Sequence, residues 1–353
     1  MSTNVRSTSA RSTAGIPATS GYADLAREIR RLGLQRRRPG FYTIVLIANL
    51  MTLGGVVTAM AFLRDSWWVM LLAVALAIVS AQIGFFGHDA GHHQVARRRV
   101  PTRLLGLLNA NLLNGLSYGW WIDKHNAHHA HPNDLEADPD VLPGILVFDA
   151  AQAAPRTGAA AWLTRHQAAL FFPLLLLEAL NLHVSSVRAL LKPGIRGRTL
   201  ELALLGVHFG GYTALLITTT TWLQAIVFLV IHQGLLGVYL GCSFAPNHKG
   251  MPTLTAAQTA DPLLRQVLTS RNVRGGPFVD FVLGGLNYQI EHHLFPSMPR
   301  PNLRKAQPVV RSFCALHRVP YAEASAFTSY RTVIRHLRDV GADLRNARKI
   351  ATR

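Results

Sequence analysis

Four apolar segments limit the folds open to this chain of 353 residues more strongly than any other feature of its sequence. They lie at about residues 41–63, 67–86, 200–219 and 223–242. A helix of about 20 apolar residues is long enough to cross the hydrocarbon layer of a bilayer, which is ~30 Å thick. We therefore expect an all-α integral membrane protein with four transmembrane helices.

The short joints between these segments predict two hairpins. Residues 64–66 separate the first two segments, and residues 220–222 separate the last two. Trp67 and Trp68 follow the first joint, and tryptophan is typical of a membrane interface. Because each hairpin returns the chain to the side on which it started, we expect both termini on one side, the cytosolic side.

The remaining segments predict a simple domain organisation. We expect residues 1–40 to form a disordered and basic cytosolic leader, and residues 343–353 a basic tail. Between them, residues 41–342 should form one membrane domain, whose last part, from about residue 300, is a cytosolic helical cap.

The chain is strongly basic, with 36 Lys and Arg against 18 Asp and Glu. These charges flank the apolar segments, which suits the anionic inner leaflet of a membrane and argues against nucleic-acid binding. The two cysteines form no CxxC pattern and therefore indicate no thiolate metal site. The excess of Arg over Lys hints at a bacterial source, and hence at a multi-pass protein of a bacterial cytoplasmic membrane.

Three short runs hold eight of the sixteen histidines. They are HDAGHH at residues 88–93, HNAHH at 125–129 and QIEHH at 289–293. Neutral imidazole is a good ligand for iron, zinc and copper. Packing does not call for adjacent imidazoles three times in one chain, so the three runs together predict one metal site.

The spacing within the runs predicts two metal ions. On a helix, residues three and four apart share a face, so His88 with His92, and His125 with His128 and His129, can converge. Eight imidazoles exceed the four to six ligands of one ion. Few carboxylates accompany them, which favours a redox-active iron pair over magnesium or calcium, although the ligand type alone leaves zinc open.

Two further apolar segments are better explained as interfacial than as spanning. If residues 104–121 crossed the membrane, the first two histidine runs would face opposite sides and could not share a site. Residues 168–190 contain Pro173 and Glu178, and the number of crossings between the second and third runs must be even. We expect both segments to lie along the interface or to pack against the site.

The three runs, in this order and with apolar hairpins between them, resemble the histidine boxes of the membrane fatty acid desaturase family. HPN at 131–133, DPDV at 138–141 and NYQIEHHLFP at 287–296 resemble its front-end branch, in which Gln replaces the first His of the third box. The resemblance extends from about residue 41 to 340.

The resemblance implies a di-iron enzyme that uses O2 and two electrons to introduce a cis double bond into the acyl chain of an acyl-CoA or acyl-lipid. The metal ligands that it implies are His88, His92, His93, His125, His128, His129, His292, His293 and, just after the last span, His248. It leaves open whether Gln289 binds iron directly, binds it through water or does not bind it.

Other residues near the runs have candidate supporting roles. The second ring nitrogen of a metal-bound histidine usually donates to a carboxylate or carbonyl, and the nearby carboxylates are Asp89, Asp123, Asp138, Asp140 and Glu291. Tyr118, Trp120 and Trp121 are candidate walls of an acyl slot, or interfacial anchors. The first 87 residues contain no histidine that could hold a haem, so we expect a separate electron donor, a ferredoxin or a cytochrome b5 with a reductase.

Two other functions remain possible from the sequence. One iron pair of this kind can also insert oxygen, as in a related lipid hydroxylase, ketolase or alkane monooxygenase. A membrane metal transporter is the second alternative. Transporters place their ligands near the midplane of the membrane, whereas the histidine runs here lie just outside the apolar segments.

Overall fold

The computed structural model describes residues 21–254 and 256–351. In chain order, its helices are α1 (Tyr22–Arg31), α2 (Pro39–Phe62), α3 (Val69–Gly91), α4 (Arg99–Gly106), the π-helix η1 (Leu107–Leu112), α5 (Tyr118–Ala130), α6 (Ala150–Ala153), α7 (Gly158–Leu175), α8 (Glu178–Leu191), α9 (Arg198–Thr219), α10 (Trp222–His248), α11 (Ala256–Ala260), α12 (Pro262–Leu268), α13 (Pro277–Val282), the 3-10 helix η2 (Leu286–Tyr288), α14 (Gln289–Leu294), α15 (Arg300–Leu316), α16 (Ala326–Val340) and α17 (Ala342–Ala351). The strands are β1 (Asn272–Arg274) and β2 (Glu323–Ser325).

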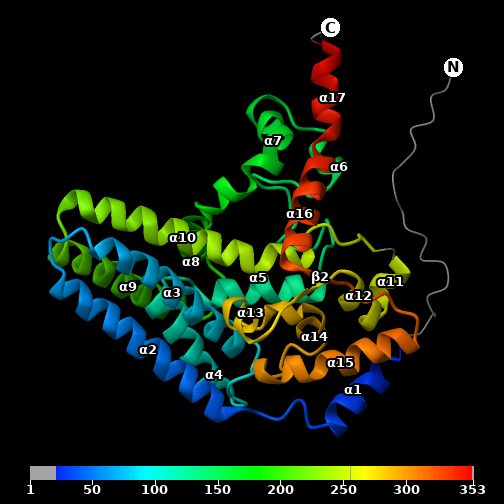
Figure 1. The fold of residues 1–353 in the computed structure, drawn as a ribbon, viewed down its shortest axis with the longest axis horizontal. Coiled ribbons are helices and arrows are strands. Elements are labelled where there is room, and N and C mark those ends of the chain that lie inside the picture. The colour runs from blue at the N-terminus through cyan, green and yellow to red at the C-terminus, as the bar shows by residue number, and fades with distance from the viewer. Residues whose placement is uncertain (1–20, 255, 352–353) are drawn as a thin grey trace.

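The predicted all-α fold with four long apolar helices is confirmed. Among the described residues, α2, α3, α9 and α10 are individually long and apolar enough to cross a membrane. They extend together to one side of the molecule, while α1, α12, α14 and α15 lie at the other end (Figure 1). Of the leader expected to be disordered, residues 1–20 lie outside the described range. In its second half, residues 22–31 form α1 and α2 begins at Pro39.

The two hairpin turns meet at the end of the bundle far from the cap. Thr221 begins α10 by accepting a hydrogen bond from the backbone N–H of Gln224, whose side chain bonds back to the backbone of Thr221. The same Gln224 side chain donates to the carbonyl of Asp65 in the other turn, at 3.0 Å. The two turns therefore hold each other in place.

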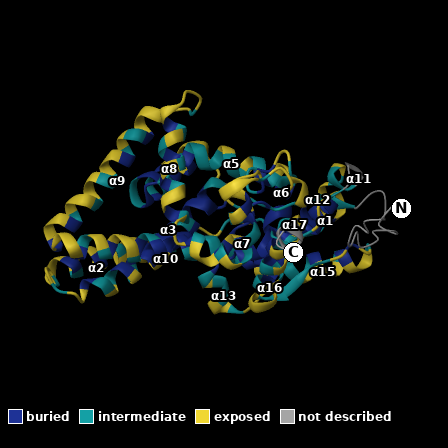
Figure 2. Ribbon diagram, turned by 90° about the horizontal axis from the view of Figure 1, so that it is seen from above, coloured by how far each residue is buried: buried dark blue, intermediate teal, exposed yellow. Residues whose placement is uncertain are grey.

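Helix α3 is the centre of the bundle. It packs against both α2 and α10, and 61% of its most apolar window is buried, compared with 17% for α2 and for α9. Exposed apolar residues such as Ile44 and Met51 cover the outer side of α2, which is what a lipid-facing surface requires. Exposed residues follow α2 and α9 in Figure 2, while the buried ones gather around α3.

The two ambiguous apolar segments are broken helices. Residues 99–112 form α4 and η1, and residues 115–117 break the helix before α5 begins at Tyr118. Helices α7 and α8 meet at 83° and would form a fifth span only if both halves were taken together. Neither segment is a single straight helix across the membrane.

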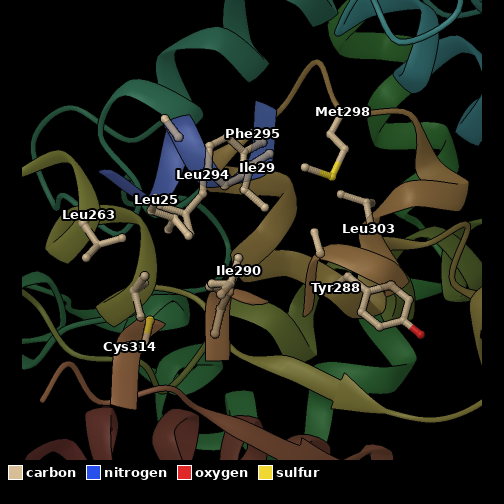
Figure 3. Packing of buried hydrophobic residues seen from close by; sticks show 14 of the residues in the cluster. Leu25, Ile29, Leu263, Tyr288, Ile290, Leu294, Phe295, Met298, Leu303 and Cys314 are labelled. Carbon is tan, nitrogen blue, oxygen red and sulfur yellow. The ribbon is translucent and has the colours of Figure 1, made fainter. Parts of the chain in front are cut away.

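The cap has its own hydrophobic core. Leu25 and Ile29 of α1 are fully buried in one cluster with Leu263 of α12, Ile290 of α14 and Leu303 of α15 (Figure 3). Helices α1, α12 and α15 thus cover α14, which carries the third histidine run. This cluster fixes α14 from the side opposite the long helices.

The sequence did not predict the small parallel sheet of the cap. Strand β1 pairs with β2 in the register Asn272 to Glu323 and Arg274 to Ser325. Three-residue strands carry too little alternation to be recognised in a sequence. The sheet ties the segment before the third run to the start of α16.

Candidate metal centre

The three histidine runs meet at the boundary between the long helices and the cap. His88 lies in the last turn of α3 and His92 ends that helix, whereas His125, His128 and His129 occupy the C-terminal half of α5. His292 and His293 lie on α14, and His248 is the last residue of α10. Four separate elements therefore deliver imidazoles to one place.

The first group consists of His88, His92, His125 and His292. One ring nitrogen of each lies within 4.8 Å of those of the others. The rings of His88 and His292 are 4.8 Å apart, and Nε2 of His92 is 2.8 Å from Nε2 of His125. Two nitrogens bound to one ion at ~2 Å are at most ~4 Å apart, so ligand nitrogens within 4.8 Å of one another are close to the spacing that a metal ion requires.

The second group consists of His128, His248 and His293, whose ligand nitrogens also lie within 4.8 Å of one another. His129 lies between the groups: its ring stacks on His293 at 4.2 Å and is 4.6 Å from His92. The spacing HNAHH on a helix gives this result, because His125 and His128 face different groups while His129 reaches both.

Several rings are held by their outer nitrogen. Nδ1 of His128 contacts both carboxylate oxygens of Asp138 at 3.0 Å, and Nδ1 of His88 lies 3.3 Å from Oδ1 of Asp89. Nδ1 of His248 donates to the carbonyl of Thr269 at 3.0 Å, and Nδ1 of His293 lies 2.9 Å from Oε1 of Gln266. Each contact leaves Nε2 to face the interior of the cluster.

Buried nitrogens without a partner mark that interior. Among the described residues, Nε2 of His88, both ring nitrogens of His292 and Nε2 of His293 are buried and form no hydrogen bond. A buried polar atom without a partner is costly. A metal ion would take up the lone pair of Nε2 of His88, of Nε2 of His293 and of one ring nitrogen of His292. The residues present therefore fit a metal centre.

Burial keeps these imidazoles neutral. It lowers the pKa of His92, His125, His129, His292 and His293 well below the usual 6.5, and the neighbouring histidines lower it further. Neutral imidazole is the form that binds a metal. At pH 7 these five imidazoles can thus accept cations without first losing protons.

The structure does not bring His93 to the cluster. Its backbone has a φ of 56°, which turns the chain after α3, and its side chain is exposed. The nearest polar contact is Thr102, whose hydroxyl lies 3.4 Å from Nδ1. The position of His93 gives no support to the ligand role that the resemblance implied.

The candidate supporting carboxylates divide into two kinds. Asp89 and Asp138 contact ligand rings, and Asp140 lies 3.5 Å from Nδ1 of His128 while pairing with Lys124. Asp123 and Glu291 do not contact the histidines: Asp123 is exposed, and Glu291 is fully buried with its oxygens bound by Asn272 and Tyr321. Glu291 thus anchors α14 to the cap.

Arg300 is a supporting residue that sequence reasoning missed. Its Nε donates to Oδ2 of Asp89 at 2.8 Å, and both side chains are almost fully buried. Its backbone N–H is shared by Tyr42 and Gln94, at 3.1 Å each. The pair is separated by 211 residues in the chain, and no local pattern could have found it.

Glu201 is a second missed residue. This buried side chain at the start of α9 accepts hydrogen bonds from Asn111 at 3.0 Å, from Ser117 at 2.7 Å and from the backbone N–H of Gly119 at 3.2 Å. Ser117 caps α5 by accepting from the N–H of Trp120. Glu201 therefore holds the end of α5 opposite its histidines. The only signal in the sequence is a carboxylate at the edge of an apolar segment.

The predicted aromatic residues lie in different surroundings. Trp121 stacks on His125 at 4.5 Å with an interplanar angle of 20°. Tyr118 lines a cavity of about 760 Å³ that also reaches His92. Trp120 is half-buried and lines none of the described cavities.

Gln289 is buried with its Nε2 2.9 Å from Nε2 of His248, next to the second group.

Comparison with known proteins agrees with this arrangement. Residues 65–325 match the family model described as fatty acid desaturase. The chain is 28% identical to the Delta(8)-fatty-acid desaturase 2 of Arabidopsis thaliana, over 92% of this chain and 77% of that protein. It is 29% identical to the acyl-lipid (9-3)-desaturase of Borago officinalis, over 93% and 76% respectively. It is 28% identical to the Delta(5) fatty acid desaturase fat-4 of Caenorhabditis elegans, over 90% and 73%.

Proposed function

Because the chain belongs to the fatty acid desaturase family and is a fatty acid desaturase, we propose that it introduces a cis double bond into a fatty acyl chain and that its clustered histidines hold two iron ions. When bound, the iron pair supplies the activation of O2 that, with two electrons from outside, removes two hydrogens from the acyl chain and yields water. The substrate is the acyl chain of an acyl-CoA or acyl-lipid.

The two histidine groups give each ion its own ligands. His88, His92, His125 and His292 would hold one ion, and His128, His248 and His293 the other. His129, which lies between the groups, would complete the second set or be shared. We propose Gln289 as a further donor beside His248, bound directly or through water.

The observation that carries this proposal is the set of buried, unpartnered ring nitrogens facing one another. Nε2 of His88 and of His293 have no hydrogen-bond partner among the described residues, while the other nitrogen of each ring is fixed by Asp89 or Gln266. Outer-shell contacts of this kind set the orientation of metal-bound histidine and raise its basicity. Buried polar atoms without a partner are uncommon in native structures, so their gathering on facing rings of one cluster supports a bound ion.

The surrounding residues would position the acyl chain and exclude water. Trp121 covers His125 and approaches His88 edge-on at 5.6 Å. Attack on one carbon of an unactivated chain depends on holding that carbon within an ångström or so of the reactive centre. The rigid indole, fixed between two ligand rings, is suited to that positioning.

We further propose that the protein lies in the membrane with the histidine cluster and the cap on the cytosolic side. The support is the arginine content next to the first and second long helices, at residues 36–38 and 97–99, since positive loops stay inside. In a background without the two native cysteines, a Cys at Arg335 should react with a membrane-impermeant maleimide only after lysis, and a Cys at Arg64 before it. The reverse pattern would contradict the orientation.

The relatives described above are plant and nematode proteins, so a bacterial source stays a prediction.

Electrons would come from a separate acidic protein such as a ferredoxin or a cytochrome b5. The net charge of +18 favours electrostatic docking of such a donor. The rate with a protein donor should fall as salt rises, and the rate with an uncharged chemical reductant should not. Equal salt dependence for both would refute charge-guided docking.

The activity is tested by expression in a host that lacks polyunsaturated lipids. Desaturation lowers the mass of an acyl chain by two hydrogens, and fragmentation of the product locates the new double bond. A gain of one oxygen would instead identify a hydroxylase or monooxygenase. Metal uptake without any change in the lipids would identify a transporter.

A His128→Ala variant is the matched control for that experiment. It should accumulate in the membrane, lose bound iron and form no product, because His128 belongs to the second group and is oriented by Asp138. His166→Ala, on α7 and outside the cluster, should remain active. Normal turnover by the His128 variant would refute the ligand assignment.

A further inference from the structure

A large cavity opens beside the first histidine group. Its volume is about 760 Å³, and its wall includes His92 at the end of α3, Tyr118 and Ile122 of α5, and Val100 of α4. Pockets of 300–1,000 Å³ are typical of small-molecule sites. Since His92 belongs to the proposed ligand set, a molecule in this cavity would lie next to the metal centre.

Three arginines line the same cavity. Arg99 and Arg103 are four residues apart on α4 and so share a face of that helix, and Arg196 comes from the turn before α9. Arg103 donates from Nη2 to the backbone carbonyl of Arg196 at 3.3 Å, which joins the two segments. Within residues 21–254 and 256–351, none of the three forms an ion pair with a carboxylate within 4.0 Å.

The two carboxylates of the cavity form no ion pair with these arginines among the described residues. Glu201 is buried and already accepts hydrogen bonds from Asn111, Ser117 and Gly119. Asp123 is exposed and lies on the α5 wall, whereas the arginines come from α4 and the turn at residues 195–197. The guanidinium groups therefore retain their capacity to bind an anion.

We propose that this cavity holds the phosphate-bearing headgroup of the acyl substrate, with Arg99, Arg103 and Arg196 binding the phosphate. Guanidinium groups match phosphate oxygens in a bidentate geometry. A single fatty-acid carboxylate would occupy little of the volume and could accept hydrogen bonds from fewer of the guanidinium groups than a phosphate can. Apolar Val100, Ile122 and Ile195 line the same cavity, and the first part of the acyl chain would lie against them. The inference rests on the proposed desaturase function.

The phosphate could belong to a phospholipid or to coenzyme A, and the experiment separates these sources. Initial rates of the purified holoenzyme are measured with an acyl-CoA in detergent and with the same acyl group on phospholipid vesicles. The wild type identifies which carrier it uses. The variants Arg99→Gln, Arg103→Gln and Arg196→Gln, and the double variant of Arg99 and Arg103, are then compared on that carrier.

The double variant should raise KM for the phosphorylated substrate about tenfold or more, because a charge-assisted contact is worth roughly a factor of ten in affinity. Its kcat and its iron content should stay within about twofold of the wild type. Arg103→Lys, which keeps the charge but not the bidentate geometry, should lie between the wild type and Arg103→Gln. Arg98→Gln and Arg198→Gln are matched controls, since both arginines are exposed beside the cavity without lining it, and should leave KM unchanged.

Two results would overturn the inference. One is an unchanged KM for the acyl substrate in all cavity variants, including Arg103→Lys and the double variant. The other is a raised KM for the protein electron donor with an unchanged KM for the acyl substrate, which would make these arginines part of the donor's docking surface. Absence of desaturation by the wild type on either carrier would instead count against the proposed function.

Discussion

His92 and His93 are adjacent in the first run and were both expected to bind a metal ion, but only His92 lies in the cluster. His92 is buried with its ring 4.7 Å from that of His292, whereas the side chain of His93 is exposed. The helix ends between them, and the positive φ of His93 turns its side chain away. The resemblance predicted that this run binds a metal ion. It did not predict the residue at which α3 ends, since helix ends are the least predictable part of an element.

This difference predicts opposite outcomes for two neighbouring substitutions. His92→Ala should lose one ligand of the first group, lower bound iron and reduce turnover at least about a hundredfold. His93→Ala should keep the iron content and most of the activity. Iron analysis of both purified variants, together with product formation, measures the contrast. Equal losses in the two variants would place His93 among the ligands.

At the same scale, the supporting contacts were predictable only where they are local. Asp89 and Asp138 lie within or near the runs, and both contact ligand rings. Arg300 contacts Asp89 and Gln266 contacts His293, each across a long separation in sequence. No local sequence pattern predicts such contacts. Glu291 was chosen for its place inside a run, yet its side chain points to Asn272 and Tyr321. Proximity in sequence does not decide the direction of a side chain on a short helix.

At the scale of elements, the four long helices were predicted to within a few residues over most of their ends, because apolar length is a strong signal. The exceptions are the C-terminal ends of α3 and α10, which extend to Gly91 and His248 and so carry polar residues beyond the apolar segment. Those last turns bring His88 and His248 into the cluster. Apolar content alone predicted neither the π-helical turn at η1 nor the 83° bend between α7 and α8.

The position of α5 depends on Glu201, which leads to a prediction at this scale. Glu201→Gln should remove the charge that Ser117, Asn111 and Gly119 stabilise and turn an amide N–H toward those donors. We expect a loss of about 1–3 kcal/mol in the free energy of unfolding and weaker iron retention by His125 and its neighbours. Thermal unfolding in detergent and iron loss to a chelator measure both effects.

Glu136→Gln is the control for this variant, because Glu136 is exposed and its side chain makes no hydrogen bond or ion pair among the described residues. It should match the wild type in both measurements. If Glu201→Gln also matched the wild type, the carboxylate would not be what fixes α5.

At the scale of the whole molecule, long helices and cap jointly enclose an imidazole cluster, and this enclosure makes the metal-free protein sensitive to acid. Burial holds the pKa of His125, His129 and His292 well below 6.5 in the folded protein, while the unfolded chain keeps values near 6.5. Below about pH 6.5 the unfolded state therefore binds more protons, and stability falls as the pH falls.

The corresponding experiment is a pH series of Tm for metal-free protein in detergent. Tm should be nearly constant above pH 7 and fall progressively from about pH 6.5 downward. A variant with His129→Gln and His292→Gln should show a shallower fall, because two of the responsible groups are gone. A Tm that rose as the pH was lowered would mean that the folded state binds more protons than the unfolded state, which would contradict the lowered pKa values of the buried histidines.

The central claim is that imidazoles from four helices, far apart in sequence, together hold two iron ions for desaturation. The most direct test is the metal content of purified protein whose desaturase activity has been measured on the same sample. The account predicts about two iron ions per chain, with activity lost when they are removed and restored when iron is returned. Full activity with one iron, with another metal or with none would contradict it.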